Sequence, residues 1–137
     1  MRLLLDTNAL LWWLTEDRRL GADPAELIGN GSNDVYVSSV SALEMATKEA
    51  IGKLRVPSDL REQMEKDFFE ELPVTVEHGL GVRALPLHHR DPFDRLLVAQ
   101  ARHEDLVLVT ADSQLHAYDV RLLLIGPAAC DSPSSQA

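Results

Sequence analysis

The order of apolar and polar positions predicts a chain in which strands and helices alternate. Leucines 3–5 form an unbroken branched apolar run, which is typical of a strand in the middle of a parallel sheet. This run stops at Asp6, and apolar residues then recur at helical spacing over 9–14. Further short apolar runs predict strands at 35–37, 74–76, 107–109 and 121–125.

Helix signals lie between these runs. Asp23 followed by Pro24 is typical of a helix start, and the turn-forming residues at 29–34 end that helix. An apolar stripe from Ser38 to Ile51 predicts a longer helix, and a second one follows Pro57. These two helices are predicted to form a projecting helical hairpin. The other predicted helices cover 77–85, 92–101 and 113–118, with a turn at 17–21, a helix stop at Pro73 and a loop at 86–90.

This alternation predicts an α/β domain, because helices that separate parallel strands must cover the faces of the sheet. We expect three layers, α/β/α, around a mostly parallel central sheet. The length of 137 residues fits one domain, which we place at residues 1–126. Residues 127–137 contain mainly Pro, Ala and Ser and predict a disordered tail.

Composition narrows the class of protein. The chain is 45% hydrophobic and 26% charged, as soluble globular proteins are, and no apolar run approaches the ~20 residues that span a membrane. The single cysteine, Cys130, excludes a disulfide within the chain, and we expect a cytoplasmic location. A net charge of −9 is unusual for a nucleic-acid binder and suits a protein that binds divalent cations or a basic partner.

Four acidic residues occupy comparable places in the predicted fold. Each lies just after a strand or in the first turns of the helix that follows. In a parallel sheet the carboxyl ends of the strands and the starts of the next helices meet at one edge. We therefore expect four carboxylates to converge there: Asp6, Glu44, Asp94 and Asp112.

Each acid also has an ordinary interpretation as a helix cap. Asp6 and Asp112 precede predicted helices, and Ser41 with Glu44 fits a capping box. Asp91 before Pro92 fits an N-cap with proline at the first helical position. For any single acid, capping is the more frequent role. Four acids at matching topological positions favour a shared site instead.

Carboxylates that converge repel one another, and a hard divalent cation relieves the repulsion. Mg²⁺ or Mn²⁺ takes oxygen ligands, activates water and stabilises charge on a phosphodiester. Hydroxyl and amide groups that could orient such a water or a phosphate oxygen lie beside the acids. They are Thr7, Asn8, Thr110 and Ser113. The sequence has no zinc-like spacing of Cys and His, since His88 and His89 are isolated, and no glycine-rich nucleotide motif.

The segments that carry the acids resemble the VapC-type toxins of the PIN-domain family. Leu3-Leu4-Leu5-Asp6-Thr7-Asn8 and the helix up to Leu14 resemble the opening of these proteins. Residues 37–54 look like their second block and 108–112 like their fourth. The third block, His89-Arg90-Asp91-Pro92-Phe93-Asp94 and on to Ala101, is the most specific. The resemblance covers residues 2–125.

The resemblance implies a Mg²⁺- or Mn²⁺-dependent endoribonuclease whose metal ligands are the four acids. It also implies inhibition by a small antitoxin encoded beside the toxin, and usually a homodimer. Many relatives carry His where Asn8 stands, and Asp91 is either a fifth ligand or only a helix cap. RNA would be attracted by local positive charge, although for any single one of these residues an ordinary solvated charge is the more frequent role: Lys48, Lys53, Arg90 and Arg95. Lys48 could instead form a helix ion pair with the acid one turn before it.

Two other functions fit the sequence. One is a partner-binding module with weak or absent nuclease activity, which would use a groove lined by the helices around 11–14 and 45–69. The other is a nuclease of housekeeping RNA processing. Trp12 and Trp13 are adjacent, so a helix cannot turn both fully inward. We expect one of them at a partner interface.

Overall fold

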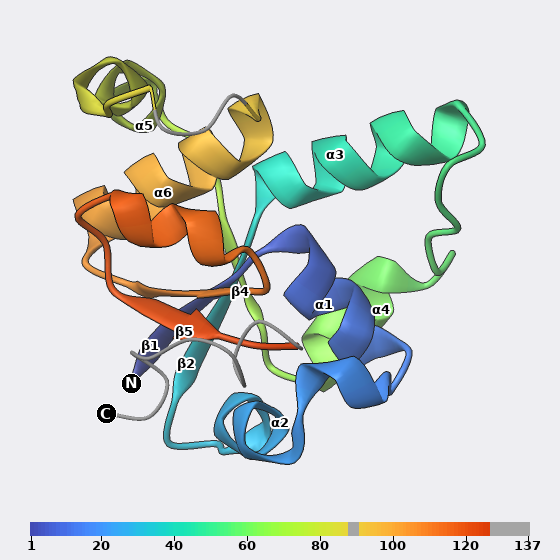
Figure 1. Ribbon diagram of the computed structural model, residues 1–137. Coiled ribbons are helices and arrows are strands. Elements are labelled where there is room, and N and C mark those ends of the chain that lie inside the picture. Colours follow the sequence, from blue (N-terminus) through green and yellow to red (C-terminus); the bar gives the residue numbers. More distant parts are fainter. Residues whose placement is uncertain (88–90, 127–137) are drawn as a thin grey trace.

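The computed structural model describes residues 1–87 and 91–126, which form a five-stranded sheet in the order β3-β2-β1-β4-β5 (Figure 1). Each pair of neighbouring strands is parallel, so the predicted parallel sheet is confirmed. The first strand of the chain is the central one, as its three buried leucines predict. The strands are β1 Arg2–Leu5, β2 Asp34–Ser38, β3 Glu70–Leu72, β4 Val107–Thr110 and β5 Leu122–Leu124.

Helices cover both faces of the sheet, which confirms the three-layer α/β/α fold (Figure 1). The α-helices are α1 Thr7–Leu14, α2 Ala22–Gly29, α3 Ser39–Ala50, α4 Leu60–Lys66, α5 Val76–Gly81 and α6 Pro92–Glu104. The described residues also include three short 3-10 helices, η1 Arg18–Leu20, η2 Val82–Ala84 and η3 Ser113–Ala117. In the part of the chain that the structure describes, no helix combines the length and the apolar character that crossing a bilayer requires.

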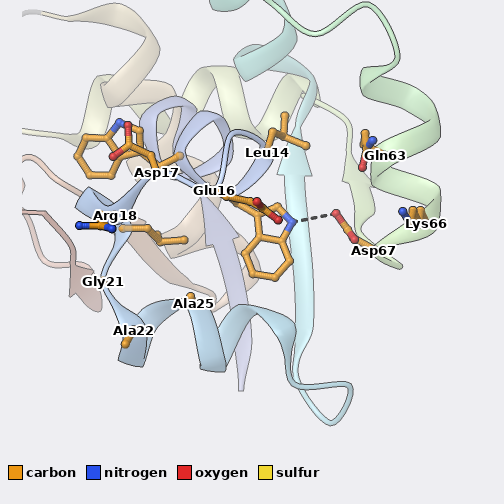
Figure 2. A pocket seen from close by; sticks show the side chains of 13 residues that line it. Leu14, Glu16, Asp17, Arg18, Gly21, Ala22, Ala25, Gln63, Lys66 and Asp67 are labelled. Carbon is orange, nitrogen blue, oxygen red and sulfur yellow. Dashed lines mark hydrogen bonds between the residues drawn. The ribbon is translucent and has the colours of Figure 1, made fainter.

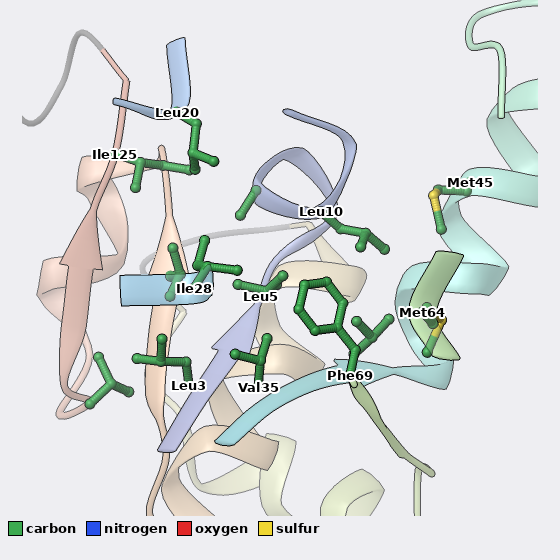
Figure 3. Packing of buried hydrophobic residues seen from close by; sticks show 14 residues of the cluster. Leu3, Leu5, Leu10, Leu20, Ile28, Val35, Met45, Met64, Phe69 and Ile125 are labelled. Carbon is green, nitrogen blue, oxygen red and sulfur yellow. The ribbon is translucent and has the colours of Figure 1, made fainter. Parts of the chain in front are cut away.

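The hydrophobic core has two halves, one on each face of the sheet. Successive side chains of a strand point to opposite faces, so Leu3 and Leu5 join one half and Leu4 joins the other. The first half packs under α1, α2 and α4 and includes Ile28, Met64 and other residues drawn in Figure 3. The second half is filled mainly by α6, and burial on both faces is what fixes β1 at the centre.

The predicted strand at 74–76 is wrong. The edge strand β3 lies earlier, at Glu70–Leu72, and Val76 begins α5. Thr75 caps that helix in a capping box with His78. An edge strand pairs on one side only and its residues are largely exposed, so its sequence carries little of the apolar signal that reveals a central strand.

Two helix boundaries also differ from the prediction. The helix predicted to begin at Pro24, with Asp23 as its N-cap, begins two residues earlier, at Ala22, with Gly21 at φ +92° as its N-cap. The helix after Pro57 ends at Lys66, because Phe68 adopts a left-handed conformation with φ +58°. This turn leaves Phe68 exposed and directs the next side chain, Phe69, into the core.

The two helices of the predicted hairpin, α3 and α4, are joined by residues 51–59. In Figure 1, α3 extends to one side of the molecule and the chain then returns to α4 near α1. The indole Nε1 of Trp13 donates to Asp67 Oδ2 at 2.8 Å, which ties the end of α4 to α1. The predicted tail at 127–137 lies outside the described residues, as do His88, His89 and Arg90.

Candidate active site

The central strands β1 and β4 carry two of the predicted acids at their carboxyl ends. Leu5 pairs with Val109 in the parallel ladder, and the next amide, that of Asp6, donates to the Val109 carbonyl at 2.9 Å. Asp6 therefore leaves β1 at the same level at which Asp112 follows β4. This is the edge of the sheet where open α/β folds place their ligands.

Both of these acids also cap helices, so the predicted capping role is confirmed for Asp6 and Asp112. Asp6 Oδ1 accepts from the Ala9 amide at 2.7 Å at the start of α1. Asp112 Oδ1 accepts from the Gln114 amide at 2.9 Å at the start of η3. Capping uses one oxygen of each carboxylate and does not exclude a second role, because each oxygen has two lone pairs.

The capping-box interpretation of Glu44 is wrong. Helix α3 begins at Ser39 with Ser38 as its N-cap, so Ser41 and Glu44 both lie inside the helix. Residues three apart on a helix share a face. Ser41 and Glu44 are both buried, and both point toward Thr7 at the start of α1.

The surroundings of Asp6 change the pKa of its carboxyl group. The residue is 5% exposed, and burial raises the pKa of its carboxyl from 3.8 to about 6. The Ala9 amide and the Thr110 hydroxyl act in the opposite direction, while the charges of Glu44 and Asp112 raise the pKa further. Two other predicted acids, Glu44 and Asp112, therefore lie close enough to Asp6 to act on its charge.

Glu44 is held by two groups. Its Oε1 accepts from the Thr7 hydroxyl at 2.5 Å, and its Oε2 accepts from Lys48 Nζ at 2.6 Å. Thr7 Oγ1 also lies 3.2 Å from Ser41 Oγ. Thr7 has one hydroxyl proton, which the shorter distance assigns to Glu44, so Ser41 donates to Thr7. Sequence reasoning missed Ser41 as a member of the site; its position three residues before Glu44 was the available signal.

Lys48 connects the remaining acid to this cluster. Its bond to Glu44 raises its pKa, and the charges of Glu44, Asp91 and Asp94 raise it further. Asp94 lies in the first turn of α6, whose N-cap is Asp91. Asp91 Oδ1 accepts from the Phe93 amide at 2.8 Å, which confirms its capping role, whereas its role as a ligand stays a prediction.

The predicted supporting residues differ in their surroundings. Thr110 is buried, acts on Asp6 and accepts from the Asp112 amide at 3.1 Å, so it links the two strand-end acids. Thr7 is buried against Glu44. Asn8 and Ser113 are exposed, next in sequence to Thr7 and Asp112. Their roles in orienting water or phosphate stay predictions.

The predicted RNA-binding cations are also placed differently. Lys48 lies in the site, and Lys53 is exposed on the segment after α3. Arg95 is 9% exposed, and its guanidinium donates to the carbonyls of Pro86 and Val82 and to the Tyr118 hydroxyl. Arg95 therefore holds the segment before α6 in place, and its burial does not favour contact with RNA.

The donor set fits a hard divalent cation. Its ligating atoms are carboxylate oxygens, which suit Mg²⁺ and Mn²⁺. Burial and the neighbouring carboxylates together raise the pKa of Asp6, so the protein's own groups do not fully compensate its negative charge. A bound cation would relieve this repulsion and keep Asp6 ionised.

A second cluster, which the sequence analysis missed, consists of His78, His103 and Glu104, whose ligand atoms lie within 4.8 Å of one another. His78 Nδ1 accepts from the Thr75 amide at 3.1 Å and lies 3.3 Å from Gln100 Nε2. This arrangement places the imidazole proton on Nε2, 2.8 Å from Glu104 Oε2. With Nε2 protonated, His78 ties α5 to α6 and offers that site no metal-binding nitrogen.

A pocket of about 550 Å³ lies apart from the acids, between the end of α1, η1, α2 and α4. Figure 2 shows Gln63 and Lys66 of α4, with Asp67 directly after that helix, on one side of the pocket, and Ala22 and Ala25 of α2 below. Both tryptophans line the pocket and both are half-buried. The guanidinium of Arg19 lies 4.9 Å from the Trp12 ring, and Trp13 packs against Phe69.

Comparison with known proteins gives one family and a set of similar folds. The PIN domain family model matches residues 3–121. VapBC2 from Rickettsia felis, bound to a promoter DNA fragment, is 16% identical with a TM-score of 0.68, over 91% of this chain and 99% of that one. FitAcB from Neisseria gonorrhoeae is 22% identical with a TM-score of 0.62, and the match covers 88% of this chain and 96% of that one. VapBC-5 from Mycobacterium tuberculosis is 20% identical with a TM-score of 0.55, and the match covers 91% of this chain and 98% of that one. No curated protein matches the sequence.

Proposed function

Because this chain belongs to the PIN domain family, we propose that it is a divalent-metal-dependent endoribonuclease and the toxin of a toxin–antitoxin pair. The observation that carries the proposal is the interaction of Asp6 with Glu44 and Asp112 at the carboxyl edge of the sheet. Such a site has the charge and the oxygen donors for phosphodiester hydrolysis.

In this proposal the cation is held by the four predicted acids, Asp6, Glu44, Asp94 and Asp112. When bound, Mg²⁺ or Mn²⁺ supplies activated water and stabilises the charge that develops on the phosphate. The chain's own groups fix the ligands: Thr7 orients Glu44 through Oε1, and Thr110 lies between Asp6 and Asp112. Because the whole chain carries a charge of −9, attraction of RNA must come from local cations such as Lys48.

The nuclease proposal is tested with purified protein, a labelled single-stranded RNA and Mg²⁺ or Mn²⁺. We expect cleavage by the parent, none with EDTA, and a loss of at least about 100-fold in Asp6→Asn and Asp94→Asn, in line with the effect of removing a group that stabilises transition-state charge. Asp119→Asn, an exposed acid outside the site, is the matched control and keeps activity. Folded Asp6→Asn and Asp94→Asn proteins that cut RNA as fast as the parent would refute the mechanism.

The toxin part of the proposal concerns an antitoxin partner. Two of the similar structures are of VapBC proteins, and VapBC-5 is a member of the VapBC family of toxin-antitoxin systems. We place the antitoxin on the pocket beside α1, since Trp12 and Trp13 offer apolar ring surface that half-burial leaves available. Growth arrest when this chain is expressed alone, relieved by the adjacent gene, is expected in a bacterial host. Unimpaired growth would favour a partner-binding module.

We also propose a cytoplasmic homodimer. Several apolar side chains are exposed on α3, on α5 and in the segment before α5: Leu43, Val74, Val76 and Leu80. The Val74 amide donates to Ser39 Oγ at 3.1 Å, which brings the segment before α5 against α3. A second copy could cover this surface. Sedimentation should give twice the monomer mass for the parent and the monomer mass for Val76→Asp.

A further inference from the structure

Lys48 is a basic residue bonded directly to a predicted metal ligand. Its Nζ lies 2.6 Å from Glu44 Oε2, and the Glu44 side chain is only 7% exposed. An ion pair four residues apart on a helix is usually a solvated surface feature of small effect. This one is different, because one partner is buried inside an acidic site.

The surroundings of the Lys48 ammonium are those of a cation-binding position. Besides Glu44, the charges of Asp91 and Asp94 act on it from the start of α6. On the other side, Glu44 Oε1 is occupied by the Thr7 hydroxyl, and Asp6 interacts with Glu44 and Asp112. Glu44 therefore lies between the Lys48 ammonium, which binds its Oε2, and the Thr7 hydroxyl, which binds its Oε1.

We propose that the Lys48 ammonium takes the place of a second divalent cation beside Glu44, so that the four acids together hold a single Mg²⁺ or Mn²⁺. Nucleases with many clustered acids often hold two metal ions. Here a tethered positive charge offsets part of the negative charge of Glu44, Asp91 and Asp94. A second cation there would meet both the ammonium and a reduced negative charge. The inference rests on the proposed metal-dependent function.

The inference is tested by counting bound Mn²⁺ with electron paramagnetic resonance and calorimetric titration. We expect one ion per chain for the parent and two for Lys48→Met, which removes the charge and keeps an unbranched apolar stem. Lys48→Arg keeps the charge and is expected to bind one ion. Lys53→Met, an exposed lysine that makes the same change in net charge, is the control and is also expected to bind one.

The outcomes separate this inference from the proposed function. A parent that binds no Mn²⁺ refutes the metal-dependent function and the inference with it. A parent that binds two ions, or Lys48→Met that still binds one with unchanged affinity, refutes the role of Lys48 and leaves the nuclease proposal intact. If Lys48→Met does not fold by circular dichroism, Lys48→Gln replaces it, and the ion count of the parent remains decisive.

Discussion

Replacing Asp6 with asparagine should stabilise the protein in the absence of metal. Asp6 is buried, and its pKa of about 6 in the folded protein exceeds the ordinary value of 3.8. The folded protein therefore binds more protons than the unfolded chain between pH 4 and 6, and stability falls as pH rises through this range. One pKa unit corresponds to about 1.4 kcal/mol, so the ionised Asp6 costs about 3 kcal/mol at pH 7.5.

The asparagine side chain would remove this charge and keep an oxygen for the Ala9 amide, since asparagine is as good an N-cap as aspartate. We expect Asp6→Asn to melt about 10 °C above the parent at pH 7.5 in EDTA, for a chain of this length. At pH 4, where Asp6 of the folded parent is already neutral, the difference should shrink to less than about 1 kcal/mol.

The assay is thermal unfolding by circular dichroism in EDTA at pH 4 and pH 7.5, repeated at pH 7.5 with Mn²⁺. Added Mn²⁺ should raise the melting temperature of the parent and leave that of Asp6→Asn nearly unchanged, because only the parent keeps the full ligand set. Asp119→Asn is the control for loss of one exposed negative charge. An Asp6→Asn protein that melts at or below the parent at pH 7.5 in EDTA would refute the electrostatic reasoning.

Contacts elsewhere in the molecule lead to three more expected outcomes. Thr7→Val, which removes the hydroxyl bonded to Glu44, should lower the free energy of unfolding by about 1.5–3 kcal/mol in urea denaturation. Thr7→Ser keeps the hydroxyl and should change it by less than about 1 kcal/mol, so equal losses in the two variants would contradict the role of this hydrogen bond. Arg95→Met should lower the free energy of unfolding by about 3 kcal/mol or more in the same assay, because the carbonyls of Pro86 and Val82 lose their donor. An unchanged free energy of unfolding would show that water replaces the guanidinium. Trp12→Ala should weaken antitoxin binding at least about 10-fold in calorimetry, and unchanged affinity would place the partner elsewhere.

Much of the fold could be predicted from the sequence, because a strand that is buried on both faces of a sheet is an uninterrupted run of apolar residues. The leucines of β1 and the valines of β4 are fully or almost fully buried, and uninterrupted apolar runs report that environment. The same argument fails for β3, whose exposed Glu70 and Glu71 lie at an edge. It also fails where a single left-handed residue, Phe68, ends a helix that the apolar spacing would continue.

The positions of Asp6 and Asp112 were predictable because parallel topology fixes where strand ends lie. Their catalytic role, like that of Glu44 and Asp94, stays a prediction. The bonds within the site were not predictable. Whether Glu44 meets Thr7 and Lys48 depends on the rotation of α3 about its axis and on its approach to α1, which are set by packing across the whole sheet.

The sequence by itself determined which segments are buried and which acids end the central strands, because both follow from local pattern and chain order. Only the tertiary structure decided what each charged side chain does. Lys48 and Arg95 look alike as isolated basic residues, yet one lies among carboxylates and the other is buried against backbone carbonyls. His78, Gln100 and Glu104 meet only because α5 packs on α6. Contacts between segments far apart in the chain depend on strand order and helix packing, which no single segment records.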